Sequence, residues 1–351
     1  MSEYEFTTVP VKRLGDSGLK ISNVVVGCMG FGSKQWFDWV EDDEEKIFGI
    51  LKKCYDHGIR TFDTADCYSN GRSEEILGRF IKKYNIKRDR IVILSKGFLY
   101  VNDEDMGCNF GNYHKYPQID SINSKGLSRK HILDAAEASA KRLGTYMDVY
   151  QIHRYDPETT PREIMKALND VVEKGYARYI GASSMKAYQF IELQFVAEQN
   201  NWHKFISMQN YNNLLYREEE REMIPFCQSH GVGIIPWSSN ARGMLTRPYD
   251  PNRKTSRQES EAAIMELLFG NMKPESDIEI INRVEKLAKK KKVSMASISI
   301  AWCVAKDYSP IVGLSSERRV DDLVVGANLI LSDEEVQYLE EPYQAKDFII
   351  L

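Results

Sequence analysis

The chain has 351 residues, of which 42% are hydrophobic and 28% are charged, and its formal net charge at pH 7 is -4. This composition predicts a soluble protein of enzyme size, and the negative charge argues against a nucleic-acid partner, which requires a basic face. The one basic run, residues 289–292, ends an expected helix, where cations meet the negative end of the helix dipole. We therefore interpret this run as a solvated surface and not as a binding patch.

The six cysteines and six histidines show none of the spacings that are typical of metal sites. Without Cys-x-x-Cys or His-Glu-x-x-His, a zinc site and a metal-dependent barrel hydrolase are disfavoured, and scattered cysteines indicate a reducing compartment. The N-terminus lacks an apolar signal segment, and no apolar run approaches the ~18 residues of a membrane span. We expect a cytoplasmic protein with no metal and no membrane contact.

The predicted elements alternate between β-rich runs and amphipathic segments. A hairpin is expected over residues 11–22. Strands are then expected at 24–30, 61–63, 91–96, 147–153, 177–184, 205–209, 233–237 and 310–313. Helices are expected at 43–57, 73–81 with Ser73 as N-cap, 128–143, 160–175, 186–198, 218–230, 278–291, 295–305, 316–325 and 332–341. Long loops are expected at 97–126 and at 238–277, the second with a short helix near 261–268.

This alternation gives eight β/α units with no internal linker. Such a pattern favours one closed (β/α)8 TIM barrel, with an N-terminal β-hairpin and residues 1–351 as a single domain, over two domains. The long loops follow the third and seventh strands. In a barrel, both lie on the face where the carboxyl ends of the strands carry the chemistry.

Polar side chains stand where three of these strands end. Asp63 and Tyr68 follow the second strand, Lys96 ends the third and His153 ends the fourth. An ammonium near a phenol favours the phenolate and lowers the phenol pKa from about 10, and a carboxylate holds the ammonium charged. Each residue taken alone is better explained as part of a structural ion pair, a packed tyrosine or a core histidine, and only the four together favour a catalytic site.

Several motifs together resemble the aldo-keto reductase superfamily. They are residues 62–68 with Gly71, Ser73 and Glu74, Leu77-Gly78, Lys96, Tyr150-Gln-Ile-His153, Ile180-Gly-Ala-Ser183, Gln209-Asn-Tyr-Asn-Asn213 and the stretch 237–245. The similarity spans roughly residues 10 to 345 and is greatest to the fungal aryl-alcohol dehydrogenase and versiconal hemiacetal acetate reductase branch. It implies that Tyr68 is the general acid, Lys96 lowers its pKa, Asp63 pairs with that lysine, and His153 orients a substrate carbonyl.

The resemblance also implies a nicotinamide cofactor, with NADPH preferred and NADH possible. Ser183 and Gln209 match positions that bind the carboxamide, Trp237 the aromatic that stacks on the ring, and Arg319 a phosphate-binding cation at the start of the last barrel helix. The full set of implied cofactor positions is Gly27, Cys28, Met29, Asp63, Ser183, Ser184, Gln209, Trp237, Ser238, Asn240, Arg242, Gly243, Leu245, Gly313, Ser315 and Arg319. No Gly-x-Gly-x-x-Gly follows a strand, which disfavours a Rossmann fold.

Three positions depart from the pattern of many relatives. Ser184 stands where an asparagine is common, Ser239-Asn240 replaces Pro-Leu, and Gly313 stands where some branches have a lysine. Ser184 in place of asparagine removes one expected contact to the carboxamide of the cofactor. Gly313 in place of lysine reduces the expected preference for NADPH over NADH.

The expected reaction is reduction of aryl or medium-chain aliphatic aldehydes and ketones to alcohols. Trp36, Trp39, Phe98 and Tyr100 are candidates for an apolar substrate pocket, with plain packing as the equal alternative. A second hypothesis is an NADPH-binding, redox-sensing regulatory subunit with little turnover. The expected partner is a small carbonyl compound, and the chain is expected to be a monomer or a weak homo-oligomer.

Overall fold

The computed structural model describes residues 8–250 and 274–349. Eight parallel strands form one sheet in the order β10-β3-β4-β5-β6-β7-β8-β9. Their bounds are β3 Val25–Gly27, β4 Thr61–Asp63, β5 Val92–Gly97, β6 Met147–Ile152, β7 Ala177–Ser183, β8 Phe205–Gln209, β9 Gly233–Ile234 and β10 Ile311–Gly313.

The two edge strands of this sheet meet and close the barrel. The amide of Ser309 donates to the carbonyl of Ile234, and the amide of Ile311 donates to the carbonyl of Pro236, both at 2.9 Å. Because all eight strands run parallel around a closed sheet, their carboxyl ends face one mouth. The predicted (β/α)8 barrel is confirmed.

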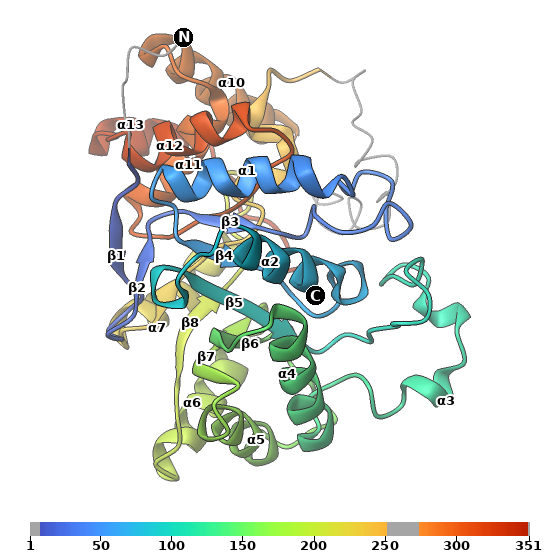
Figure 1. The fold of residues 1–351 in the computed structure, drawn as a ribbon. Coiled ribbons are helices and arrows are strands. Elements are labelled where there is room, and N and C mark those ends of the chain that lie inside the picture. Colours follow the sequence, from blue (N-terminus) through green and yellow to red (C-terminus); the bar gives the residue numbers. More distant parts are fainter. Residues whose placement is uncertain (1–7, 251–273, 350–351) are drawn as a thin grey trace.

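Helices surround the strands (Figure 1). Their bounds are α1 Glu44–Asp56, α2 Arg72–Lys83, α3 Gln118–Ser121, α4 Arg129–Leu143, α5 Pro161–Glu173, α6 Ala187–Gln199, α7 Met223–Ser229, α10 Pro274–Lys291, α11 Met295–Ala305, α12 Arg318–Asn328 and α13 Asp333–Glu340. Ser128, Thr160 and Ser332 accept backbone N–H bonds as N-caps, as the sequence predicts. Among the helices of the described residues, none is both long and apolar enough to span a membrane.

The N-terminal hairpin closes the end of the barrel opposite to this mouth. Strands β1 (Val11–Arg13) and β2 (Lys20–Ser22) pair in antiparallel fashion, as predicted. Leu14 and Ile21 then pack with residues from inside the barrel, Val92, Leu94, Val149 and Ile235. With that end filled by apolar side chains, the mouth at the carboxyl ends is left for a ligand.

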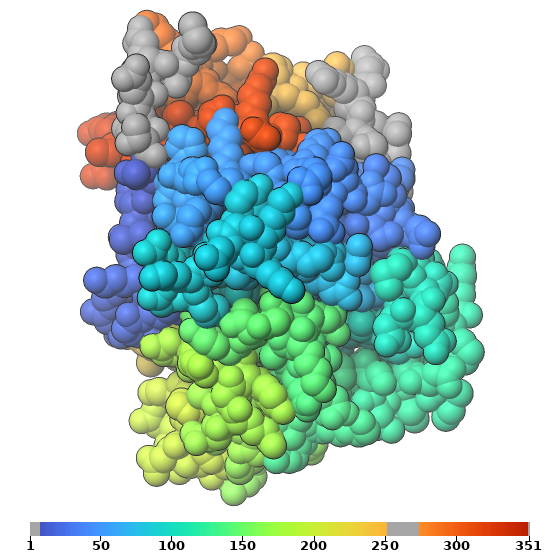
Figure 2. All heavy atoms as spheres, in the orientation of Figure 1, coloured from blue at the N-terminus to red at the C-terminus, as the bar shows by residue number. Residues whose placement is uncertain are grey.

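The segment after β5 extends away from the barrel. It carries the 3-10 turn η3 (Tyr113–Lys115) and α3, and Figures 1 and 2 show it standing out beside the barrel helices. The sequence predicted only a loop here. The helix expected near 261–268 lies outside the described residues.

Three local predictions are wrong, each for a physical reason. The expected helix 218–230 is a 3-10 turn, η4 (Glu218–Glu220), followed by α7, because Pro225 is tolerated only in a first helical turn. Ser73 is not an N-cap, since its hydroxyl is buried and donates to the carbonyl of Cys28. The last helix before α11 includes residues 274–277, which were assigned to the loop.

Candidate functional site

Strand register brings Asp63 and Lys96 together inside the mouth of the barrel. Asp63 pairs with Leu94 across β4 and β5, and Leu94 points into the barrel core. Because side chains alternate along a strand, Lys96 points to the same side as Leu94. Tyr68 follows in the 3-10 turn η1 (Tyr68–Gly71), whose Ser69 and Asn70 have φ of 48° and 50°.

The turn that holds Tyr68 is anchored from the segment after β5. The side chain of Asn70 donates to the carbonyl of Cys108 at 2.7 Å and accepts from the amide of Asn102 at 3.0 Å. Left-handed backbone at a non-glycine residue costs energy, so it persists only where neighbours hold it. The long insertion therefore helps to position Tyr68.

Lys96 is fully buried and uses all three of its N–H donors. Its Nζ donates to Oδ2 of Asp63 at 2.7 Å, to the carbonyl of Thr64 at 2.7 Å and to Oη of Tyr68 at 3.2 Å. An ammonium has three donors, so the set is complete. Since the phenol oxygen accepts from Lys96, the hydroxyl proton of Tyr68 points away from the lysine.

The protonation states of this pair follow from burial and charge. Burial raises the pKa of Tyr68 to about 12, and the Lys96 ammonium is the largest influence in the opposite direction. Lys96 thus acts on the pKa of Tyr68 in the expected downward direction, but burial outweighs it and the net shift is upward. Burial alone lowers the pKa of Lys96, but Asp63 and Tyr68 more than offset this, so the ammonium stays charged.

Asp63 also binds two glutamines. Its Oδ1 accepts from Nε2 of Gln209 at 2.9 Å and from Nε2 of Gln151 at 3.2 Å, and Gln209 also donates to Oε1 of Gln151 at 3.2 Å. These bonds fix the carboxylate at the floor of the mouth. The amide nitrogen of Gln209 is thus already engaged, which leaves its oxygen as the atom suited to a ligand.

His153 lies beside Tyr68 at the end of β6. The two rings are 5.9 Å apart and nearly perpendicular, and Nδ1 of His153 is 3.7 Å from Sγ of Cys67. Burial, with smaller effects from Arg154 and Lys96, holds the pKa of His153 well below its ordinary value, so the ring is neutral. Burial also raises the pKa of the Cys67 thiol, so it keeps its proton and can donate to Nδ1. This contact favours the tautomer with the proton on Nε2.

An apolar cluster covers another side of Tyr68. Trp36 is 2% exposed, its ring lies 6.2 Å from that of Tyr68, and Trp39 packs against the same cluster. The sequence missed further members of this cluster: Met29, which it assigned to the cofactor, and Phe37, Leu99, Val101 and Phe110. Phe98 packs instead against the main core, and Tyr100 is half-buried outside the described clusters, so the structure does not join these two to Trp36.

A second group of predicted residues lies at the ends of β7, β8 and β9. Ser183 pairs with Gln209 across β7 and β8, and its hydroxyl donates to the carbonyl of Gln209 at 2.9 Å. Trp237 stacks on Tyr211 with ring centroids 4.7 Å apart, and its Nε1 donates to Oγ of Ser184 at 3.0 Å. Ser184 therefore holds Trp237 in place.

The stretch after Trp237 has unusual backbone. Ser238, Ala241 and Arg242 have φ of 53°, 46° and 51°, and Gly243 has φ of 96°. Oδ1 of Asn240 is buried and has no hydrogen-bond partner among the described residues, whereas Leu245 is fully buried in the main core. Strained backbone and an orphaned acceptor are typical of loops that bind ligands.

A third group lies where β10, β3 and β4 run side by side. Gly313 pairs with Gly27, and Gly27 pairs with Asp63, so these backbones meet at one level of the mouth. Cys28 is buried in the core behind them. Ser315 and Arg319 are exposed at the start of α12.

Two residues near the site were missed by the sequence reasoning. Gln151 was read as part of a strand, although its alternation with His153 could have indicated that it points inward. Arg154 directly follows His153, and its guanidinium donates to the carbonyl of His153 at 2.6 Å and lies 6.0 Å from the ring of Trp237.

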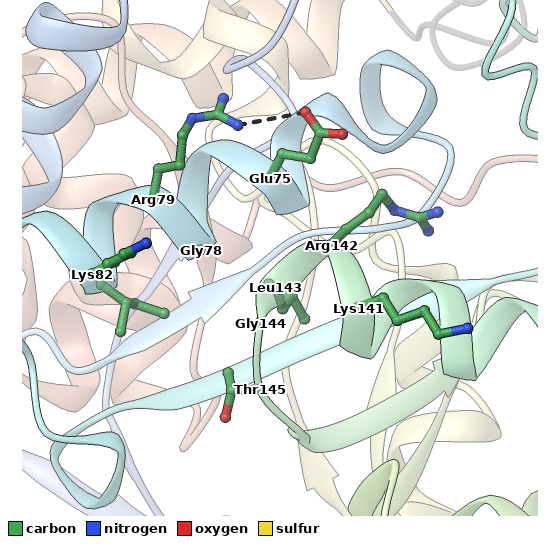
Figure 3. A pocket seen from close by; sticks show the side chains of 10 residues that line it. Glu75, Gly78, Arg79, Lys82, Lys141, Arg142, Leu143, Gly144 and Thr145 are labelled. Carbon is green, nitrogen blue, oxygen red and sulfur yellow. Dashed lines mark ion pairs between the residues drawn. The ribbon is translucent and has the colours of Figure 1, made fainter.

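A separate hollow lies on the outside of the barrel, between α2 and α4 (Figure 3). Three of its four basic side chains have carboxylate partners: Arg79 pairs with Glu75 at 3.5 Å, Lys141 with Glu137 at 2.7 Å and Arg142 with Glu74 at 2.6 Å. It extends toward Thr145, near the amino end of β6, which is opposite to the mouth. None of the predicted site residues lines it, so the candidate site is the mouth.

Comparison with known proteins agrees with this geometry. A model described as the aldo/keto reductase family matches residues 24–344. A proposed aryl-alcohol dehydrogenase of Saccharomyces cerevisiae is 55% identical over 333 residues, which is 95% of this chain and 96% of the relative. A proposed aryl-alcohol dehydrogenase of Schizosaccharomyces pombe is 56% identical over 336 residues, 94% of each chain. The versiconal hemiacetal acetate reductase of Aspergillus parasiticus is 54% identical over 336 residues, 95% of this chain and 97% of the relative.

Proposed function

This chain belongs to the aldo/keto reductase family, and we propose that it reduces aryl or medium-chain aliphatic aldehydes and ketones to alcohols with NADPH. The observation that carries the proposal is the bond from Lys96 to Oη of Tyr68. In this arrangement the phenol of Tyr68 is protonated and accepts a hydrogen bond from buried Lys96, so its own proton points away from the lysine. Such a group suits proton delivery to an alkoxide that forms in the mouth.

His153 and Lys96 support that proton transfer in different ways. Neutral His153, with its proton on Nε2, donates a hydrogen bond to the substrate carbonyl and fixes its orientation beside Tyr68. Donors aimed at a developing oxyanion are often the largest single catalytic contribution. Lys96 stabilises negative charge on the phenol oxygen once the proton has left, and Asp63 keeps Lys96 charged.

The residues around the mouth fit a nicotinamide cofactor. When bound, the cofactor supplies a hydride to the carbonyl carbon. The indole of Trp237, already fixed by Ser184 and Tyr211, offers a flat surface for the ring, and the oxygen of Gln209 and the hydroxyl of Ser183 suit its carboxamide. The orphaned Oδ1 of Asn240 and the left-handed backbone around Arg242 fit a loop over the phosphates.

NADPH is preferred over NADH because of the start of α12. Arg319 is exposed there, in the first turn of the helix. A guanidinium binds a phosphate through two parallel hydrogen bonds. Gly313 brings no lysine to the same place, so we expect the preference to be moderate.

The proposal is tested by oxidation of NADPH against benzaldehydes, alkanals and polycyclic ketones. Replacing Tyr68 by phenylalanine removes the proton donor, so turnover should fall by about 10² to 10⁴ while NADPH binding persists. Tyr113→Phe, on the exposed segment that carries α3, is the matched control and should keep wild-type turnover.

Equal turnover by Tyr68→Phe would remove Tyr68 from the mechanism. Binding of NADPH without turnover of any carbonyl compound would instead support the regulatory-subunit hypothesis.

A further inference from the structure

We propose that Arg154 forms an anion-binding subsite within the substrate pocket, so that the enzyme prefers carbonyl substrates that carry a carboxylate. This inference rests on the proposed function and adds a substrate class to it. Nothing in the comparisons assigns a role to this residue.

The position of Arg154 places its charge beside the reacting groups. It directly follows His153, and its guanidinium carbon lies 6.0 Å from the ring of Trp237. Burial lowers the pKa of Arg154, and the charges of Tyr68 and Cys67 act in the opposite direction. The guanidinium therefore lies beside the proposed nicotinamide platform and within electrostatic reach of the proposed proton donor.

No carboxylate neutralises this guanidinium within the described part of the chain. Within that part, its one hydrogen bond goes from Nη1 to the carbonyl of His153, which leaves most of its five N–H groups for another acceptor. Asp63 of the site and Asp156, two residues farther along the chain, bind other groups. Asp63 binds Lys96 and two glutamines, and Asp156 accepts from the amide of Leu127 at 2.7 Å and from the hydroxyl of Thr159 at 2.8 Å.

Three other partly buried arginines of the chain differ in this respect. Arg88 binds Asp148 at 2.5 Å, Arg142 binds Glu74 at 2.6 Å and Arg217 binds Glu220 at 2.7 Å. A charge removed from water is costly unless it is paired. The half-buried guanidinium of Arg154 is left to be paired by a ligand, and a carboxylate matches its planar fork.

The other walls of the pocket define the rest of the substrate. The apolar cluster around Trp36 packs against Tyr68 on another side, and it suits a ring or an alkyl chain. A substrate that fits both features has an apolar body, a carbonyl group at one end and an acid group that reaches Arg154. 4-Carboxybenzaldehyde has this form, and 4-carbamoylbenzaldehyde is its neutral counterpart of nearly equal shape.

The experiment compares kcat/KM for these two aldehydes. Wild-type enzyme should prefer the carboxylate by about tenfold or more, since hydrogen bonds to charged groups exceed neutral ones in strength. Arg154→Gln should abolish this preference, mainly through KM, and Arg154→Lys should retain part of it. Arg178→Gln, at an exposed arginine on β7, is the control and should keep the wild-type preference.

A binding measurement makes the outcome independent of turnover. Benzene-1,4-dicarboxylate should change the tryptophan fluorescence of wild-type protein at concentrations about tenfold lower than for Arg154→Gln, because Trp237 lies beside the guanidinium. Equal aldehyde preferences in wild type and Arg154→Gln would overturn the inference and leave the proposed reductase intact. Absence of all turnover would contradict the proposed function, and the dicarboxylate titration would then decide the role of Arg154 alone.

Discussion

Burial sets the charge of most ionisable groups around Tyr68. The phenol and the Cys67 thiol keep their protons and His153 stays neutral, because water is excluded from the charged form of each. Lys96 is the exception, since Asp63 pairs with it at 2.7 Å. The site therefore presents one buried cation behind two neutral donors, which is the arrangement that a reduction needs before negative charge develops.

These states predict the pH dependence of reduction. A general acid must be protonated, and the pKa of Tyr68 is raised to about 12, so kcat/KM should be level from about pH 6 to about pH 9 and decline only at higher pH. No inflection should occur near pH 6.5, the ordinary pKa of histidine, because that of His153 lies well below it. Steady-state rates in buffers of constant ionic strength measure both the plateau in kcat/KM and the absence of an inflection near pH 6.5. A midpoint below about pH 9 that belongs to Tyr68 would contradict a buried, protonated phenol.

The same histidine affects stability with a defined sign. In the unfolded chain His153 takes up a proton below about pH 6.5, whereas in the folded protein it does so only at much lower pH. The unfolded state then binds more protons, so His153 should reduce the free energy of unfolding as the pH falls through that range. Urea titrations of wild type and His153→Gln at two pH values measure this effect. His203→Gln, at an exposed histidine, serves as the control.

Among the elements, the barrel strands and most helices could be predicted because their signals are local. Period-two or continuous apolar runs, cap residues and the positions of proline and glycine mark them. Element ends were less accurate. β9 has only two residues because Pro236, which lacks an N–H, follows closely, and the ends of α10 and α12 each differ from the prediction.

The parts of the site that escaped prediction depend on contacts between distant residues. Cys67 meets His153 across 86 positions, and Gln209 meets Asp63 across 146. Neither contact has a local signal, and the burial that raises the pKa of Tyr68 has none either. The aromatic residues near the mouth show the same limit, since Trp36 joins Tyr68 but Phe98 turns to the main core.

The contact between helices α2 and α4 gives a prediction about how these elements pack. A Cβ atom at Gly78 would lie 2.7 Å from the carbonyl oxygen of Leu143 and 2.9 Å from that of Arg142. Backbone oxygens cannot rotate away, so Gly78→Ala should force the helices apart. The energy lost by this separation should exceed the ~1 kcal/mol gained in helix propensity. We expect a loss of about 1–2 kcal/mol in the free energy of unfolding, measured by urea titration.

Gly18→Ala is the control for this substitution. A Cβ atom there meets nothing within 4 Å, so stability should change little. If both variants unfold at the same urea concentration as the wild type, the close approach of α2 and α4 does not explain the glycine in the Leu77-Gly78 motif.

At the scale of the whole molecule, one end of the barrel is filled and the other carries the candidate site. Leu14 and Ile21 of the hairpin occupy the first end, and the candidate cofactor residues lie around the second, on β3, β7, β8, the stretch after Trp237 and the start of α12. A ligand held by segments so far apart in sequence connects parts of the chain that otherwise separate on unfolding. Binding to the folded state alone then raises its stability.

This arrangement predicts a cofactor-dependent thermal shift that does not rely on a substrate. NADPH at about 100 times its dissociation constant should stabilise the protein by about 2.7 kcal/mol and raise Tm by several degrees, and NADH at the same concentration should raise it less. Arg319→Ala should reduce the NADPH shift and leave the NADH shift unchanged, because only NADPH carries the additional phosphate. Arg318→Ala, a neighbouring exposed arginine at the start of α12, is the matched control and should behave as the wild type. Equal shifts with both cofactors in the wild type, or equal losses in the two variants, would show that Arg319 does not select the phosphate.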